Sequence, residues 1–196
     1  MRSDFSSALR PAIVLTILFA LLLGLAYPLA LTAVGQMLFP QQSNGSIVRD
    51  GKGTPVGSAL IGQGFAGAGY FHGRPSAAGK GYDGLNSSGS NYGPASKALV
   101  DRVTTDVAAL RKDGVAGALP ADSVTASGSG LDPDISPATA YLQVPRIAEA
   151  RGFSENQVRA LVDRTIDRPV AGILGEDRVN VLALNLALDR MAGRTR

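Results

Sequence analysis

AIVLTILFALLLGLAYPLALTAV, residues 12–34, is an almost wholly apolar stretch near the N-terminus of this 196-residue chain. It lies inside a longer segment, residues 11–48, that carries no charged side chain. A helix over residues 12–34 would be about 34 Å long at ~1.5 Å per residue, and the hydrocarbon core of a bilayer is roughly 30 Å thick. The stretch therefore predicts one transmembrane helix in contact with the lipid bilayer.

Two other interpretations of the apolar stretch remain. A buried helix of a soluble protein rarely needs so long an apolar run. A cleaved signal peptide has a shorter apolar region that ends at a small-x-small site. Here the apolar run continues to Leu38 and Phe39, and no good site follows at the right distance. The sequence therefore favours an uncleaved anchor.

The anchor divides the chain into four predicted parts. These are a cytoplasmic tail (1–11), the transmembrane helix (12–34), a juxtamembrane linker (35–45) and a soluble domain (46–196). Lys and Arg gather on the cytoplasmic side of a membrane helix. The flanking arginines therefore predict a cytoplasmic N-terminus and an extracytoplasmic domain at the inner or plasma membrane.

One face of the predicted transmembrane helix carries small residues. Ala20 and Gly24 are four residues apart, and Pro28 continues the same face. Small residues let a second transmembrane helix approach closely, so Ala20, Gly24 and Pro28 are the predicted packing face. The alternative is that such a pair occurs by chance, as it does in many membrane helices.

Composition limits the class of the polar domain. The formal net charge of the chain is only +3, and nucleic-acid binding needs a concentrated basic face. Cysteine is absent, which excludes disulfides, thiolate metal sites and a cysteine nucleophile. With 24 Gly and 11 Pro, the domain is expected to be rich in loops.

The order of predicted elements indicates an α+β domain. Short strands are expected on both sides of a Gly-rich turn at residues 50–53, followed by a long irregular loop at 62–94 and a short strand at 119–124. Helical spacing, N-caps and helix breakers predict helices at 94–112, at 137–151 with a break or bend at Pro145, at 154–166 and at 180–191.

Most motifs in the domain fit catalysis poorly. Residues 73–81 resemble a phosphate-binding loop, but the glycine spacing is wrong and Gly81 replaces the magnesium-binding Ser or Thr. His72 is the only histidine, so a membrane-anchored extracytoplasmic hydrolase would have to use it. No pattern has zinc-like spacing. The densest polar motif, residues 125–133, is either an anion-binding loop or a turn capped by its own Asp side chains.

Several further motifs occur in a specific order along the chain. They are Leu60-Ile61-Gly62-Gln63-x-Phe65, Tyr70-Phe71-x-x-Arg74-Pro75-Ser76, Tyr82-Asp83, Ser88-Gly89-Ser90-Asn91-x-Gly93-Pro94, residues 124–137, Gln143-Val144-Pro145-Arg146 and residues 175–185. With the single N-terminal helix, they make the chain resemble, nearly end to end, the C subunit of Kdp-type potassium-transporting ATPases.

The resemblance implies a non-catalytic accessory subunit. Its partners would be a P-type ATPase catalytic subunit, which hydrolyses ATP, and a potassium-channel-like subunit. The family's C subunit is needed for assembly and is described as a catalytic chaperone that raises the pump's affinity for ATP. By motif, the nucleotide-binding proposal for the family falls on Ser127, Gly128, Ser129, Gly130 and Gln143.

The predicted orientation conflicts with direct nucleotide contact. A domain outside the cytoplasm cannot touch ATP inside it. Either the orientation is reversed or the effect on ATP affinity is indirect, and the sequence favours the indirect effect.

Overall fold

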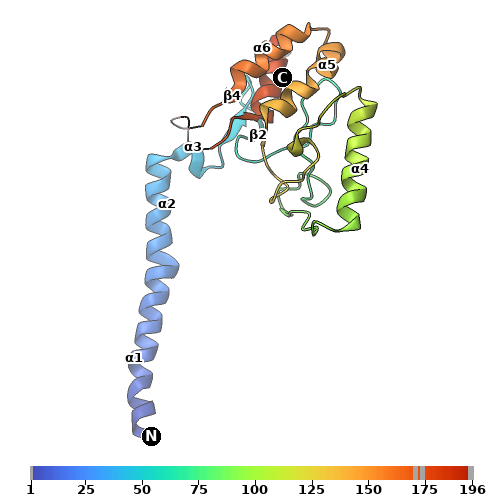
Figure 1. Cartoon of the computed structure of the whole chain (residues 1–196). Helices are drawn as coiled ribbons and strands as arrows, with labels where there is room; N and C mark the ends of the chain where they lie inside the picture. The colour runs from blue at the N-terminus through green and yellow to red at the C-terminus, as the bar shows by residue number, and fades with distance from the viewer. Residues whose placement is uncertain (1, 170–171, 173–174, 194–196) are drawn as a thin grey trace. The chain divides into compact units, whose positions relative to one another are not determined.

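The computed structural model describes residues 2–169, 172 and 175–193. The chain forms two compact units, Met1–Ser46 and Ile47–Arg196 (Figure 1). The first unit is helical, and the second combines helices with short strands. The predicted architecture, a long apolar N-terminal helix followed by a small α+β domain, is confirmed.

The N-terminal unit is helical for nearly its whole length. Its elements are α1 (Arg2–Leu21), the π-helical turn η1 (Leu22–Ala26), α2 (Tyr27–Leu38) and the short α3 (Pro40–Ser43). The helical stretch Ser7–Leu38 is long and apolar enough to cross a membrane. Residues 2–11 and most of residues 35–45, expected as a tail and a linker, are therefore helical too.

The π-helical turn has a cause in the sequence. Pro28 follows this turn. Proline has no N–H, and its ring crowds the carbonyl four residues before it, which here is the carbonyl of Gly24. The turn widens at this point, and the N–H of Tyr27 donates to the carbonyl of Leu22, five residues back. Ala20, Gly24 and Pro28 are all exposed. The π-helical turn lies between Ala20 and Pro28, so the spacing of the three residues is not that of a regular α-helix.

A two-stranded antiparallel hairpin begins the second unit. β1 (Ile47–Arg49) pairs with β2 (Pro55–Ser58). Oδ1 of Asp50 accepts hydrogen bonds from the backbone N–H groups of Lys52 (2.8 Å) and Thr54 (2.9 Å), which closes the turn. The strands predicted around a Gly-rich turn are confirmed.

The core lies in the C-terminal half, where three helices cover a small sheet. The helices are α5 (Pro137–Arg151), α6 (Glu155–Thr165) and α7 (Val181–Met191), and the strands are β3 (Asp134–Ile135), β4 (Ile166–Asp167) and β5 (Arg178–Asn180). The antiparallel strands lie in the order β3-β5-β4. The fully buried core includes Val144, Ile147, Val158, Val162, Val179, Leu184 and Leu188.

The predicted caps form as expected. Ser136 and Asn180 each accept a backbone hydrogen bond at the start of their helices, and Ser154 with Gln157 forms a capping box. Of the break or bend predicted at Pro145, the break is wrong, because α5 continues through Pro145 as one helix. Buried residues on both sides of the proline hold the helix together, and this packing outweighs the lost hydrogen bond.

Two other predicted boundaries differ from the structure. Helix α4 (Lys97–Lys112) begins three residues after Pro94, with Ser96 as its N-cap residue. The strand predicted at 119–124 is wrong, since a 3₁₀ turn, η2 (Ala121–Ser123), occupies this segment. The carboxylate of Asp122 there accepts hydrogen bonds from the backbone and hydroxyl of Ser136, so the segment serves as a support for the start of α5.

Candidate functional site

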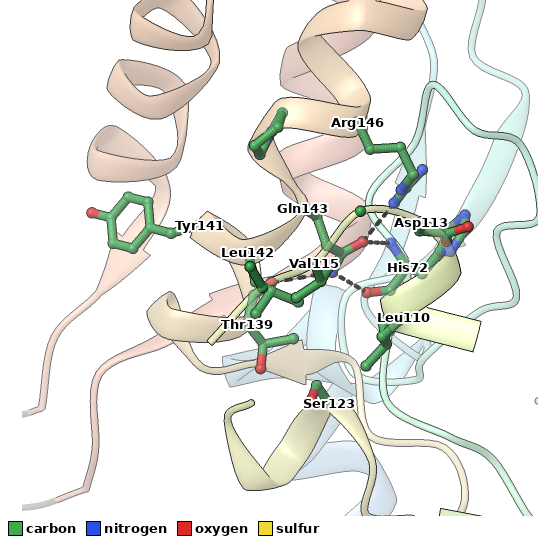
Figure 2. A pocket seen from close by; sticks show the side chains of 14 residues that line it. His72, Leu110, Asp113, Val115, Ser123, Thr139, Tyr141, Leu142, Gln143 and Arg146 are labelled. Carbon is green, nitrogen blue, oxygen red and sulfur yellow. Dashed lines mark hydrogen bonds between the residues drawn. The ribbon is translucent and has the colours of Figure 1, made fainter. Parts of the chain in front are cut away.

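Residues 62–94 form a long loop without helix or strand, and side chains of α5 and α7 hold it in place. Gln143 of α5 makes the central contact. Its Oε1 accepts from the backbone N–H of His72 (2.8 Å), and its Nε2 donates to the carbonyl of the same residue (3.0 Å). Figure 2 shows this two-way bond, which imitates the pairing of neighbouring β-strands.

Asn185 of α7 makes the same kind of two-way bond with Phe71, the residue before His72. Its Oδ1 accepts from the N–H of Phe71 (2.8 Å), and its Nδ2 donates to the Phe71 carbonyl (2.9 Å). Asn185 is only 2% exposed, and the Phe71 side chain is fully buried in the core. Two consecutive loop residues are therefore fixed from two helices, an arrangement that we call the amide clamp (Gln143 and Asn185 on His72 and Phe71).

Gln143 has no hydrogen-bonding capacity left over. Its Oε1 also accepts from Nη2 of Arg146 (2.8 Å), and its Nε2 also donates to the carbonyl of Thr139 (3.3 Å). A side-chain amide offers two donors and two acceptor lone pairs. All four are used inside the protein, so a ligand could bond to this amide only by displacing an existing partner.

Two arginines hold the part of the loop before the clamp. Arg146 donates to the carbonyls of Ala68 and Tyr70. Arg151 donates to the carbonyl of Gly69 (2.7 Å), and its guanidinium lies 4.4 Å from the centre of the Tyr70 ring. Both guanidinium groups thus spend part of their hydrogen-bonding capacity on backbone carbonyls of the loop.

The Ser-Gly segment, residues 127–130, packs against the same long loop. Ser127 is buried. The carbonyl of Ser129 accepts from the N–H of Ser88 (2.9 Å), and that of Gly130 accepts from the hydroxyl of Ser76 (2.6 Å). The segment thus presents acceptors to the loop, whereas an anion site needs free backbone N–H groups.

A cavity of about 280 Å³ lies between α5, the end of α4 and the loop. Figure 2 shows the side chains around it. Its walls include His72, Leu110, Asp113, Val115, Ser123, Thr139, Tyr141, Leu142, Gln143 and Arg146. Of the five residues predicted for nucleotide contact, Gln143 lines this cavity, while Ser127, Gly128, Ser129 and Gly130 do not. The structure does not bring the five together around one space.

The contacts of His72 are not those of a catalytic triad. Burial, helped by the positive charge of Arg146, lowers the pKa of His72 below its ordinary value. The imidazole Nε2 lies 3.1 Å from the carbonyl of Gly67, whereas a nucleophilic triad requires a serine hydroxyl at the base. Among the described residues, no group of three or more His, Asp and Glu could hold a metal ion.

Comparison with known proteins identifies the family. A family model described as "KdpC: K+-transporting ATPase, c chain" matches residues 9–190. The chain belongs to the KdpC family. Its relatives include the potassium-transporting ATPase KdpC subunits of Caulobacter vibrioides (61% identical, covering 93% of both chains), Rhodopseudomonas palustris (54%, covering 94% of this chain and 98% of the relative) and Myxococcus xanthus (54%, covering 98% and 90%).

Membership of the KdpC family confirms the resemblance drawn from the motifs. The chain is a subunit of a potassium-transporting ATPase complex, anchored in the membrane by its N-terminal helix, and other Kdp subunits are its partners. Asn185 was not predicted as part of a site, although the sequence carries a signal for it. It is a polar residue on the apolar stripe of α7, between Val181 and Leu188.

Proposed function

We propose that this KdpC-family chain is a non-catalytic accessory subunit that stabilises the assembled potassium pump. Its partners would be the P-type ATPase catalytic subunit and the potassium-channel-like subunit. The observation that carries the proposal is the amide clamp. Gln143 uses its whole amide inside the protein, with two hydrogen bonds to the loop at His72 and two to Thr139 and Arg146 of its own helix, which suits a rigid interaction module.

We infer that the N-terminus is cytoplasmic and that the polar domain lies outside the cytoplasm. Arg10 precedes the apolar helix, and the first cation after it is Arg49. The domain then acts on the pump's affinity for ATP indirectly, by holding the partner subunits in an active arrangement. Packing of the anchor beside their membrane helices and of the domain over the channel subunit's outer mouth would supply the coupling.

Direct ATP binding is the second candidate function, because the resemblance to the C subunits of Kdp-type ATPases implies it. The saturated amide of Gln143 argues against it. The volume of the cavity beside that amide also argues against ATP binding. About 280 Å³ lies at the lower limit of the roughly 300–1,000 Å³ that holds drug-sized ligands, and ATP is large and highly charged. A hydrolase using His72 has no supporting contact among the described residues.

Single-cysteine labelling tests the orientation, because the chain has no native cysteine. Leu85 is 95% exposed, so Leu85→Cys gives a probe site on the domain surface. A membrane-impermeant maleimide should label Leu85→Cys in intact cells and Ser3→Cys only after lysis. The opposite pattern would place the domain in the cytoplasm and reopen direct nucleotide contact.

A matched pair of substitutions tests the anchor's packing. Ala20→Leu adds bulk on the proposed face, and Ala30→Leu adds the same bulk away from it. We expect Ala20→Leu to reduce co-purification of the two partner subunits several-fold and Ala30→Leu to leave it unchanged. Equal recovery with both variants would show that this face does not contact a partner.

A further inference from the structure

Three exposed apolar side chains gather at one end of the β1–β2 hairpin. Ile47 begins β1 and pairs with Ser58, the last residue of β2, and Leu60 and Ile61 follow shortly after it. The exposed fractions are 40% for Ile47, 61% for Leu60 and 44% for Ile61. Single exposed apolar residues are normal on a protein surface, whereas a local group of them points to contact with a protein or a membrane. We call these three residues the hairpin patch.

The fold holds the second half of the patch outward. Ahead of it, the carbonyl of Ala59 accepts from Nδ2 of Asn180 (3.1 Å). Behind it, the N–H of Gly62 donates to the carbonyl of Leu131 (2.8 Å). The two patch residues between these contacts therefore have a fixed backbone and exposed side chains. Docking through them would order little additional chain, which lowers the entropic cost of the contact.

A short, folded connection ties the patch to the membrane anchor. Ile47 directly follows Ser46, whose N–H donates to the carbonyl of Gln41 (2.9 Å). Gln41 comes three residues after Leu38, which ends the apolar helix that anchors the chain. With consecutive Cα atoms ~3.8 Å apart, this path keeps Ile47 within roughly 22 Å of Leu38. The hairpin patch therefore begins within reach of the bilayer surface.

The charged groups beside Leu60 balance one another. The groove that Leu60 lines also contains Asp134, Asp167, Arg178 and Arg190. Arg178 pairs with Asp134 (3.4 Å) and with Asp167 (2.5 Å). Two carboxylates and two guanidinium groups leave no formal net charge along this groove. A surface that docks here is therefore selected by apolar burial and not by its charge.

We propose that the hairpin patch docks on the surface of the bilayer beside the anchor. Ile47, Leu60 and Ile61 enter the boundary between lipid headgroups and acyl chains, which limits rotation of the domain about its anchor. The short connection to the anchor selects the bilayer over other apolar surfaces. The proposal needs only the membrane anchor, so it holds for either orientation of the chain and does not depend on the role of the subunit in the pump.

Fluorescence quenching of the full chain in phosphatidylcholine nanodiscs tests the contact. Since the chain has no native cysteine, Leu60→Cys carries a single environment-sensitive fluorophore, which lipids with a nitroxide near the top of the acyl chain quench. Val100→Cys is the matched control, because Val100 is an exposed apolar residue on α4, outside the patch. We expect at least threefold stronger quenching at Leu60→Cys than at Val100→Cys. Equal quenching at the two positions would overturn the proposal.

A further set of variants separates the patch from the tether, because the anchor alone keeps Ile47 near the membrane. With the fluorophore on Ile47→Cys, the pair Leu60→Ser and Ile61→Ser should reduce quenching at least twofold. Val100→Ser should leave it unchanged. Unaltered quenching after loss of both apolar side chains would overturn the apolar contact. Melting temperatures are measured in parallel, and Leu60→Ser alone gives the same test with a smaller decrease if the double variant does not fold.

Two changes of surroundings test the choice of partner. Quenching at Leu60→Cys should agree within twofold between phosphatidylcholine and phosphatidylglycerol nanodiscs. Quenching that occurs only in phosphatidylglycerol and is lost at high salt would indicate attraction by charge and overturn the apolar contact. Quenching should also persist when the labelled chain is reconstituted with unlabelled partner subunits. Its loss in the assembled complex would show that a partner subunit covers the patch, and would overturn docking on the bilayer.

Discussion

The side-chain amide of Gln143 and the backbone of His72 form two reciprocal hydrogen bonds, 2.8 and 3.0 Å long, between a helix and an irregular loop. A loop of this length has many backbone groups to satisfy and few elements of its own to satisfy them. The clamp meets this need and joins residues 71 positions apart in the sequence. Gln143 therefore acts mainly to stabilise the fold.

Gln143→Ala should destabilise the domain by about 1–3 kcal/mol, because it leaves the N–H and carbonyl of His72 without partners in a half-buried site. Urea unfolding of the full chain in detergent measures the change. Asn156→Ala is the control, because Asn156 is an exposed amide on α6 and should shift the midpoint very little.

The same variant separates a structural role from nucleotide binding. If Gln143 holds the loop, any loss of pump activity in Gln143→Ala should follow the loss of stability and recover at lower temperature. Unchanged stability together with a lost affinity for ATP in the isolated chain would contradict the clamp and support direct binding.

Two glycines of the Ser-Gly segment should respond differently to alanine. Gly130 has φ +67°, and a Cβ there would lie 2.6 Å from the backbone N of Ala78 and the carbonyl O of Ser88. Gly130→Ala should therefore cost about 1–3 kcal/mol. Gly128 has nothing within 4 Å of its Cβ position, so Gly128→Ala should be nearly neutral. Urea midpoints compare the two, and similar effects would show that the segment is not packed against the loop.

The stability of the domain should fall as the pH decreases below about 6.5. Burial and Arg146 lower the pKa of His72 in the folded state, whereas the unfolded chain binds the proton near 6.5. Between these two pKa values the unfolded state holds more protons, so acidification favours unfolding. Urea midpoints at pH 7.5 and 5.5 measure this dependence.

His72→Gln isolates that effect, because His72 is the only histidine. The variant should lose much of the decrease in midpoint between pH 7.5 and 5.5. The single imidazole resonance in an NMR titration gives the pKa directly. A native pKa above 6.5 would reverse the sign and disprove the assignment.

Local signals in the sequence were enough to predict the helices and the anchor. Ser154 and Gln157 form the expected capping box, and Asn180 caps α7, because capping depends on residues within one turn. The same local signals wrongly predicted a strand around Asp122, where the structure has a 3₁₀ turn. Asp122 accepts hydrogen bonds from Ser136 and Thr139, fourteen and seventeen residues away, and no local pattern contains those partners.

The site was harder to predict than the fold for the same reason. Gln143 was singled out through the family resemblance, and its contact with His72 depends on how the long loop returns to α5. The structure places Gln143 and residues 127–130 against different parts of that loop. Their shared contact with a nucleotide therefore stays a prediction. Asn185 had a readable signal, but its partner could not be identified without the fold.

Breaking the ion pair between Arg151 and Asp189 should be the most costly of these changes. Their side chains are only 5% and 12% exposed, and the charged atoms lie 2.9 Å apart. Arg151→Met leaves the carboxylate of Asp189 without its counter-charge and the carbonyl of Gly69 without its donor, so we expect a loss of about 3–5 kcal/mol. Lys97→Met is the control, since Lys97 and Asp101 form an exposed pair (85% and 59%) worth about 1 kcal/mol or less. Urea unfolding of both variants measures the difference, and equal losses would mean that the Arg151 pair contributes no more than a surface contact.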